Sequence, residues 1–313
     1  MRRVRVKPLV VSMIVFAILS PVEMQGEKIS IREVLTIGDD SDGIIYQWVG
    51  LTTDDEKNIY LTDLKDFSIK KFNADGRFIA KTGQKGQGPG DFLTPGVIRY
   101  HDGFLFVGQI QNPGIQVFDT NLNFMKSVPL RNLVTSFCIL GNDLIAASTL
   151  MSNKIVFFNS MGDEVRSLRY SDTEDLMLNA VDIFVDDEHL YLCFKWQDTI
   201  GKYSRDGTKI WEKNLLRAGK PKKKKVGDYL LPQDICFKSI TVDHKNSLVY
   251  VLGGDLSKNV SRDVYILLKD GTWVGTITLP EPSHMIHVDE DGYLYSRSEY
   301  GTLLKKYQLI LNE

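Results

Sequence analysis

Short runs of apolar and alternating residues, separated by turn-forming residues, fill the chain from residue 28 to its C-terminal end. Runs of this length with a period of two are typical of β-strands, and the Asp, Asn and Gly clusters between them are typical of tight hairpins. No stretch after residue 28 has the long, capped 3.6-residue period of a helix. The pattern therefore predicts an all-β protein.

The runs repeat as units of four strands, and the unit is clearest in the first copy. Strands at 49–53, 58–63, 68–72 and 77–83 are separated by polar turns, the last of which is an Asp-Gly pair. The other predicted first strands are 96–100, 136–140, 181–185, 239–242 and 285–288. Equivalent positions of the second strands hold Tyr60, Phe106, Ile145, Tyr191, Tyr250 and Tyr295.

Repeats of four antiparallel strands with a period of roughly 40–60 residues are typical of β-propellers. The count of units predicts a single six-bladed propeller over residues 28–313. The last unit ends without a fourth strand, whereas the segment 28–38 is a strand without a unit. We therefore expect 28–38 to complete blade six as its outer strand and close the ring.

One junction between units carries a specific motif, KTGQKGQGPGDFLTPGVI at residues 81–98. It resembles the signature of NHL-repeat propellers, and a degraded copy lies at 227–232. The resemblance implies an NHL-type propeller of the bacterial exported six-bladed group. Such propellers bind proteins, nucleic acids or small ligands, and proteins of the same shape include hydrolases and lyases. The motif residues are Gly83, Gly86, Gly88, Pro89, Gly90, Asp91, Phe92, Pro95 and Ile98.

The first 26 residues have the pattern of an export signal. Basic residues at 2–7 precede the uncharged run 9–20, which is too short to span a bilayer comfortably. We expect residues 1–26 to be a signal peptide or an uncleaved N-terminal anchor. Either interpretation places the body outside the cytoplasm, in the periplasm or secreted.

Charge and cysteine content remove several classes of function. The formal net charge of −2 gives no general attraction for nucleic acid or anionic lipid. The three cysteines are far apart and lie in apolar runs, so they predict buried side chains rather than a disulfide framework. We expect no nucleic-acid partner, and membrane contact only through an uncleaved N-terminal segment.

The first strands should line the central channel, and their side chains predict its chemistry. If Thr53 and its equivalents end these strands, the preceding residues should face the channel. These residues are Thr52, Arg99, Ile139, Phe184, Thr241 and His287, and two positions further back lies Asp182. One carboxylate and one histidine do not make a calcium or zinc site. We therefore expect no metal, no cofactor and no catalytic residue, although Arg99, Asp182 and His287 could form a polar cluster.

The loops that enter the first strands, and those between second and third strands, should form the ligand face. The candidate ligand-binding residues on this face and in the channel are Asp63, Arg99, Gln109, Asp182, Lys195, Trp196, His287, Arg297 and Tyr300. Trp196 and Tyr300 beside polar groups would suit a peptide or sugar surface. The lysine run 220–225 falls on the same face, either as a solvated loop or as a site for an anionic polymer.

Two functions from different classes fit these observations. The first is a monomeric, exported, non-catalytic module that binds a protein, peptide or glycan through its ligand face. The alternative is an exported hydrolase or lyase that uses the polar channel cluster. Convergence of three or more of the polar candidates on one cavity would favour the enzyme: Asp63, Arg99, Asp182, Arg297 and His287.

Overall fold

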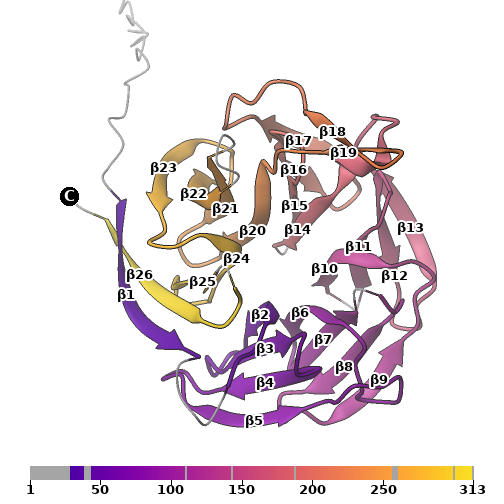
Figure 1. Cartoon of the computed structure of the whole chain (residues 1–313), viewed down its shortest axis with the longest axis vertical. Coiled ribbons are helices and arrows are strands. Elements are labelled where there is room, and N and C mark those ends of the chain that lie inside the picture. The colour runs from indigo at the N-terminus through magenta and orange to yellow at the C-terminus, as the bar shows by residue number, and fades with distance from the viewer. Residues whose placement is uncertain are drawn as a thin grey trace, which may run out of the picture.

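The computed structural model is a ring of six antiparallel four-stranded sheets around a central channel (Figure 1). It describes residues 29–38, 44–109, 111–141, 144–186, 188–255, 260–298 and 300–311. The prediction of an all-β, six-bladed propeller is confirmed. The expected export segment, residues 1–26, lies outside the described residues. Within the described part, no helix is long and apolar enough to cross a membrane.

Each blade runs from an inner strand at the channel to an outer strand at the rim (Figure 1). Blades one and two are β2 (Trp48–Thr53), β3 (Ile59–Asp63), β4 (Ser68–Phe72) and β5 (Phe78–Thr82), then β6 (Pro95–His101), β7 (Phe104–Gln109), β8 (Ile115–Asp119) and β9 (Phe124–Val128). Blades three and four are β10 (Val134–Leu140), β11 (Leu144–Thr149), β12 (Lys154–Phe158) and β13 (Glu164–Arg169), then β14 (Val181–Val185), β15 (His189–Phe194), β16 (Ile200–Ser204) and β17 (Lys209–Lys213). Blade five is β20 (Phe237–Asp243), β21 (Leu248–Asp255), β22 (Val260–Leu268) and β23 (Trp273–Thr278).

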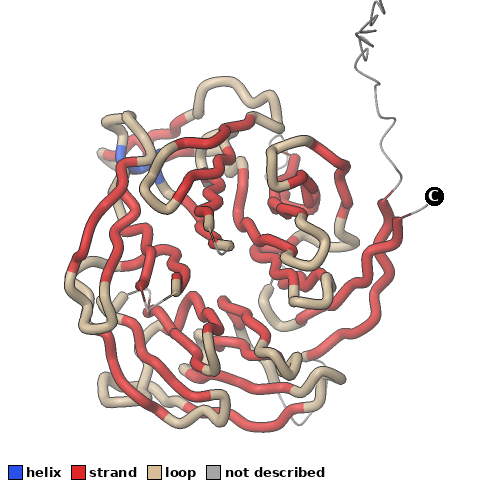
Figure 2. Tube along the Cα trace, turned by 180° about the vertical axis from the view of Figure 1, so that it is seen from behind, coloured by secondary structure: helices blue, strands red, loops and turns tan. Residues whose placement is uncertain are grey.

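Blade six joins the two ends of the described chain. Its strands are β24 (Ser283–Val288), β25 (Leu294–Ser298), β26 (Leu304–Leu311) and β1 (Ile29–Ile37). Strand β1 pairs antiparallel with β26 from Ile29 opposite Leu311 to Ile37 opposite Leu304. The predicted closure is confirmed, and in Figure 2 the first and last described strands lie side by side at the edge of the ring. Because the last blade needs strands from both ends, opening the ring breaks a full strand pairing.

Blade-to-blade packing follows the alternation of the inner strands. The residue between the two channel-facing positions is apolar in every blade, and each is buried: Leu51, Ile98, Cys138, Ile183, Ile240 and Ile286. Small polar side chains then tie one inner strand to the next. The hydroxyl of Thr52 accepts the Tyr100 N–H at 3.1 Å, and that of Thr241 accepts the Val288 N–H at 3.3 Å. Such bonds satisfy backbone groups that a dry interface would otherwise leave unpaired.

The repeated tyrosine has a partner that fixes its place. In blades one, four and six the tyrosine hydroxyl donates at 2.8 Å to an aspartate at the turn after the inner strand, and in blade five it does so at 3.5 Å. The pairs are Tyr60–Asp54, Tyr191–Asp186, Tyr250–Asp243 and Tyr295–Asp289. A buried hydroxyl needs such an acceptor. In blades two and three, Phe106 and Ile145 stand at this position and carry no hydroxyl.

Glycines stand where the backbone must turn with positive φ. The turn between third and fourth strands uses Gly76, Gly162, Gly207 and Gly271, each with φ between 83° and 95°. In the motif at 81–98, Gly83 has φ 98°, and a Cβ there would lie 2.8 Å from the Phe67 carbonyl oxygen. The motif loop thus lets Phe92 enter the core between blades one and two, where it is fully buried.

The lysine run forms part of a β-hairpin and not the solvated loop that the sequence suggested. Residues Lys223–Val226 form β18, which pairs with β19 (Tyr229–Pro232) as a hairpin between blades four and five. The supposed second motif copy therefore supplies the turn and second strand of this hairpin, not another Gly-rich crossing. The lysine strand is exposed, and Lys223 pairs with Asp175 at the start of the 3-10 turn η1 (Leu176–Asn179).

Candidate ligand-binding site

The central channel has two chemically different ends. We call the end with the turns between first and second strands the hairpin end. The opposite end, with the loops that enter the inner strands and those between second and third strands, is the loop end. A hollow lies at each, and together they contain most of the residues predicted from the sequence.

The hairpin end holds a cavity of about 480 Å³ within the ring of inner strands. Its apolar wall includes Ile139, Phe184 and Val242. Its acidic lining comes from the turns: Asp54, Asp55, Asp102, Asp186, Asp289 and Glu290. Most of these carboxylates are already engaged by the fold, three of them by the tyrosines of the repeat and Asp55 by the Tyr100 hydroxyl at 2.6 Å.

Arg99 and His287 both line this cavity. The His287 Nε2 lies 3.1 Å from the Thr53 hydroxyl of the neighbouring blade. Burial, together with the positive charge of Arg99, lowers the pKa of His287 to about 4 against an opposing effect of Asp289. The ring is therefore neutral at pH 7. The Arg99 guanidinium lies 6.0 Å from the centre of the Phe184 ring, and its Nε is buried without a hydrogen-bond partner among the described residues.

Asp182 links three blades rather than facing the hairpin-end cavity. One of its oxygens accepts the Ser136 hydroxyl at 2.6 Å, and the other accepts the Ile240 N–H at 3.0 Å. The Arg99 Nη2 approaches to 4.0 Å. Arg99 and His287 therefore share one cavity, while Asp182 braces the channel wall and lines the hollow at the other end.

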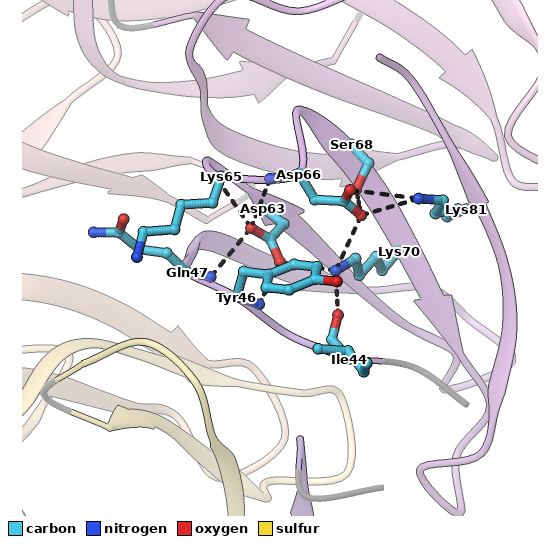
Figure 3. A network of polar contacts seen from close by, with 9 residues as sticks. All are labelled: Ile44, Tyr46, Gln47, Asp63, Lys65, Asp66, Ser68, Lys70 and Lys81. Carbon is cyan, nitrogen blue, oxygen red and sulfur yellow. Dashed lines mark hydrogen bonds and ion pairs between the residues drawn. The ribbon is translucent and has the colours of Figure 1, made fainter. Parts of the chain in front are cut away.

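Asp63 has a structural place that the sequence analysis did not foresee. Its fully buried carboxylate accepts the N–H groups of Tyr46 and Gln47 at 2.8 and 3.1 Å and pairs with Lys70 at 2.8 Å (Figure 3). The N–H groups of Lys65 and Asp66 also donate to it. Because its oxygens are filled by groups of the chain, Asp63 holds the start of blade one together and is not available to a ligand.

Gln109, Arg297 and Tyr300 are dispersed around the loop end. The Gln109 side chain is buried and accepts the Leu93 N–H at 2.9 Å, so it fixes the loop after the Gly-rich motif. Tyr300 is 79% exposed and projects from the loop of blade six. Arg297 is half-buried, with its guanidinium 5.7 Å from the centre of the Trp48 ring. Two of the predicted candidates, Asp63 and Gln109, therefore serve the scaffold.

The hollow at the loop end is a groove of about 380 Å³ across blades three, four and five. We call it the Trp196 groove. Its lining is Thr135, Thr149, Leu150, Met151, Leu176, Met177, Ala180, Val181, Asp182, Lys195, Trp196, Phe237 and Lys238. Leu150 and Met151 are 58% and 55% exposed. Exposed aliphatic side chains gathered around a half-buried tryptophan are typical of an interaction site.

The loop that carries Trp196 is held in place by the scaffold. The Lys195 N–H donates to the Ala180 carbonyl, and its own carbonyl accepts the Cys236 N–H, both at 2.8 Å. The Gln197 side chain donates to the Leu178 carbonyl at 3.0 Å. A preformed loop loses little conformational entropy when a partner binds. The groove is therefore a built surface rather than a mobile loop.

Basic side chains surround the channel beside this groove. Lys195 and Lys238 line the groove itself, and the Lys195 Nζ lies 5.1 Å from the centre of the Trp196 ring. Loss of solvent around His284, and then the charges of Lys238, Arg297 and Lys195, lower the pKa of His284 to about 4. Blades four, five and six thus direct positive charge to one place.

The five polar candidates do not all line one cavity. Of the five that were to decide the question, Arg99 and His287 line one cavity, and the other three lie elsewhere. Among the described residues, no three His, Cys, Asp or Glu side chains come together in a way that could hold a metal ion. The sequence analysis also missed Leu150, Met151 and Lys238, because nothing in a single strand or loop shows that three blades meet there.

Comparisons with known proteins support the architecture. No protein-family model matches the sequence, and no curated protein does. Three solved structures resemble the chain: an inactive histidine-to-alanine variant of virginiamycin B lyase from Staphylococcus aureus with quinupristin, a protein of unknown function from Bacteroides thetaiotaomicron, and the WD40 propeller domain of Doa1.

The three structures have TM-scores of 0.57, 0.63 and 0.58 and sequence identities of 14%, 11% and 12%, in that order. The alignments cover 90%, 90% and 89% of this chain, and 100%, 76% and 97% of the other chains. At such identities the likeness shows the fold alone. The chain is a six-bladed β-propeller whose structural neighbours include a lyase and a WD40 propeller domain.

Proposed function

We propose that this protein is an exported, non-catalytic binding propeller whose Trp196 groove takes a segment of a partner protein or peptide. The observation that carries the proposal is the exposed aliphatic lining around Trp196, on a loop whose backbone is fixed at Lys195. A groove of about 380 Å³ accommodates one or two side chains rather than a whole domain. We expect the protein to act as a monomer.

A peptide fits the groove better than a glycan does. Leucine and methionine side chains form its exposed walls at Leu150, Met151 and Leu176. Flexible aliphatic walls suit aliphatic or aromatic side chains of a ligand, because their contact is dispersive and apolar. The pattern of residues 1–26 supports export, so the partner is expected in the periplasm or outside the cell.

A peptide library displayed on phage tests the proposal. We expect wild-type protein to enrich peptides with a shared apolar residue, and Trp196→Ala to lose that enrichment. Trp273→Ala is the matched control, because Trp273 is also exposed, at 51%, but lies on the outer strand of blade five. Enrichment that survives Trp196→Ala but not Trp273→Ala would place the binding surface elsewhere.

The alternative is a hydrolase or lyase, and one observation favours it. A neutral histidine, His287, lines a cavity of about 480 Å³ and could accept a proton from a bound substrate. The lyase among the structural neighbours was solved with quinupristin as an inactive histidine-to-alanine variant. Incubation of this protein with quinupristin, followed by mass spectrometry, should show no conversion. Conversion that disappears in His287→Ala would establish the alternative.

A further inference from the structure

The basic residues at the loop end suggest which kind of peptide the groove selects. We propose that Lys195, Lys238 and Arg297 form a carboxylate site beside the Trp196 groove, so that the partner is a peptide with an acidic group next to an apolar side chain. The inference rests on the proposed function, because it assigns chemistry to the same surface. It adds the charge of the ligand and the residues that recognise it.

The first observation is that three positively charged side chains come from three blades. Lys195 comes from the loop after β15, Lys238 from inner strand β20 and Arg297 from β25. All three act electrostatically on the single ring of His284 at the start of β24. Lys195 and Lys238 both line the Trp196 groove, and the charge of Arg297 acts together with theirs on the pKa of His284. Three blades therefore present their cations to a common region.

The second observation is that carboxylates of the chain do not pair with all of these cations. Among the described residues, no ion pair joins Lys195 or Arg297 to a carboxylate. Lys70 and Lys305, elsewhere in the fold, each pair with two carboxylates. The carboxylate that lines the groove, Asp182, is engaged by the Ser136 hydroxyl, the Ile240 N–H and, at 4.0 Å, by Arg99.

Arg297 supplies the third observation. Its Nε is buried and has no hydrogen-bond partner among the described residues, and burial lowers the pKa of its guanidinium. The unpartnered Nε–H of Arg297, beside the Trp48 ring, costs free energy that an incoming carboxylate can recover through a charge-assisted hydrogen bond.

The apolar groove and the cations belong to one site. Lys195 and Lys238 line the same hollow as Leu150 and Trp196, and Arg297 acts on His284 together with both lysines. A ligand that places an aliphatic side chain in the groove therefore brings its next polar group toward the channel. The Leu and Met walls favour a peptide over an acidic sugar or a nucleic acid, which would use stacked rings.

The test uses paired synthetic peptides and the full exported protein. Hexapeptides with a central Leu or Met are made in matched versions that carry Asp or Asn beside it, and in free-acid and amidated forms. Isothermal titration calorimetry should show the Asp or free-acid version binding at least about tenfold more tightly, as expected for a charge-assisted hydrogen bond. Lys195→Met and Lys238→Met should each reduce this preference to about threefold or less while neutral peptides keep their affinity.

Lys224→Met is the control, because Lys224 is exposed on the hairpin β18–β19 outside the groove lining. It should leave the Asp preference unchanged. Equal binding of Asp and Asn peptides, lost in Trp196→Ala, would overturn the carboxylate site and keep the binding groove. Binding of none of the peptides would overturn the proposed function itself. Tighter binding of a single-stranded RNA or an acidic polysaccharide than of any peptide would show that the cations serve a polyanion.

Discussion

The two ends of the channel differ in how the chain treats its charges. At the hairpin end, Asp54, Asp186 and Asp289 are held by the hydroxyls of the repeated tyrosines, and Lys269 and Lys306 approach two of them to 3.2 and 3.4 Å. At the loop end, the described residues offer Lys195 and Arg297 no carboxylate. Charges that have partners inside the fold contribute to stability, whereas cations without a carboxylate partner are candidates for binding an external anion. The difference supports the proposed binding role of the loop end.

Asp63 is an exception at the loop end, and it allows the strongest test of the comparison. Asp63→Ala would take one of two carboxylate partners from the buried ammonium of Lys70 and leave several backbone N–H groups without their acceptor. Breaking a buried pair in this way costs about 3–5 kcal/mol. Urea unfolding should show that loss, whereas Asp75→Ala in the exposed turn of the same blade should change stability by less than about 0.5 kcal/mol.

If Asp63 instead served a ligand, the result would be different. Stability would then be kept in Asp63→Ala while peptide binding was lost. The double variant Asp63→Ala with Lys70→Met separates the two causes further. Because it also removes the buried ammonium that has lost one of its carboxylate partners, it should recover part of the lost stability.

The pH dependence of stability tests the hairpin end through His287. Its pKa in the folded protein is lowered from 6.5 to about 4, chiefly by burial and then by Arg99, against Asp289. As pH falls from 6.5 to 4, the unfolded chain takes up the proton and the folded chain does not, so this residue makes the protein less stable. The loss amounts to about 2–3 kcal/mol by pH 4.

Urea unfolding of wild-type protein and His287→Gln at pH 7 and pH 4 measures this term. Paired carboxylates also lose stabilising interactions in acid, but they do so in both proteins. The difference between the two pH-dependent losses therefore isolates His287. An identical loss in the variant would mean that the ring titrates normally and is solvated.

A tyrosine of the repeat gives the next largest effect. Tyr295→Phe would leave the buried Asp289 without the hydroxyl that donates to it at 2.8 Å, at a cost of about 1–3 kcal/mol. Blades two and three show that the fold accepts a residue without a hydroxyl at this position when no aspartate needs one. Phe106→Tyr in blade two should therefore add no stability. Thermal unfolding of the two variants shows whether the change in stability comes from the lost hydrogen bond or from any change at the aromatic ring.

Most of the fold could be predicted from the sequence because propeller blades are local. Each strand pairs with a neighbour along the chain, so the alternation and the turn residues of one blade are enough to define it. The pairing of β1 with β26, which are far apart in the sequence, could also be predicted. The last unit lacks a fourth strand, and residues 28–38 form a strand that belongs to no unit. The repeated tyrosine could be recognised in the sequence, but the aspartate that accepts its hydrogen bond could not be distinguished from the other turn residues.

The candidate site could be predicted only in part. Lys195 and Trp196 were found because they lie on a loop at the expected face. Asp63 and Gln109 lie near that face too, yet their side chains turn inward to backbone N–H groups, which spacing along a strand cannot reveal. Leu150 and Lys238 come from other blades, and their place beside Trp196 depends on how the blades are rotated about the channel. The hairpin of β18 and β19 was not predicted, because five basic residues close together in the sequence suggested a solvated loop.

The smallest expected effect on stability is also the one that most directly tests the comparison. If the loop-end cations are held close together for a ligand, they repel one another in the free protein. Lys195→Met should therefore leave the free energy of unfolding unchanged or raise it by up to about 0.5 kcal/mol, because functional sites commonly trade stability for binding. Chemical denaturation at low salt measures the gain, and added salt should remove it by screening the repulsion. A loss of more than about 1 kcal/mol would show that Lys195 has a stabilising partner, and the loop end would then resemble the hairpin end.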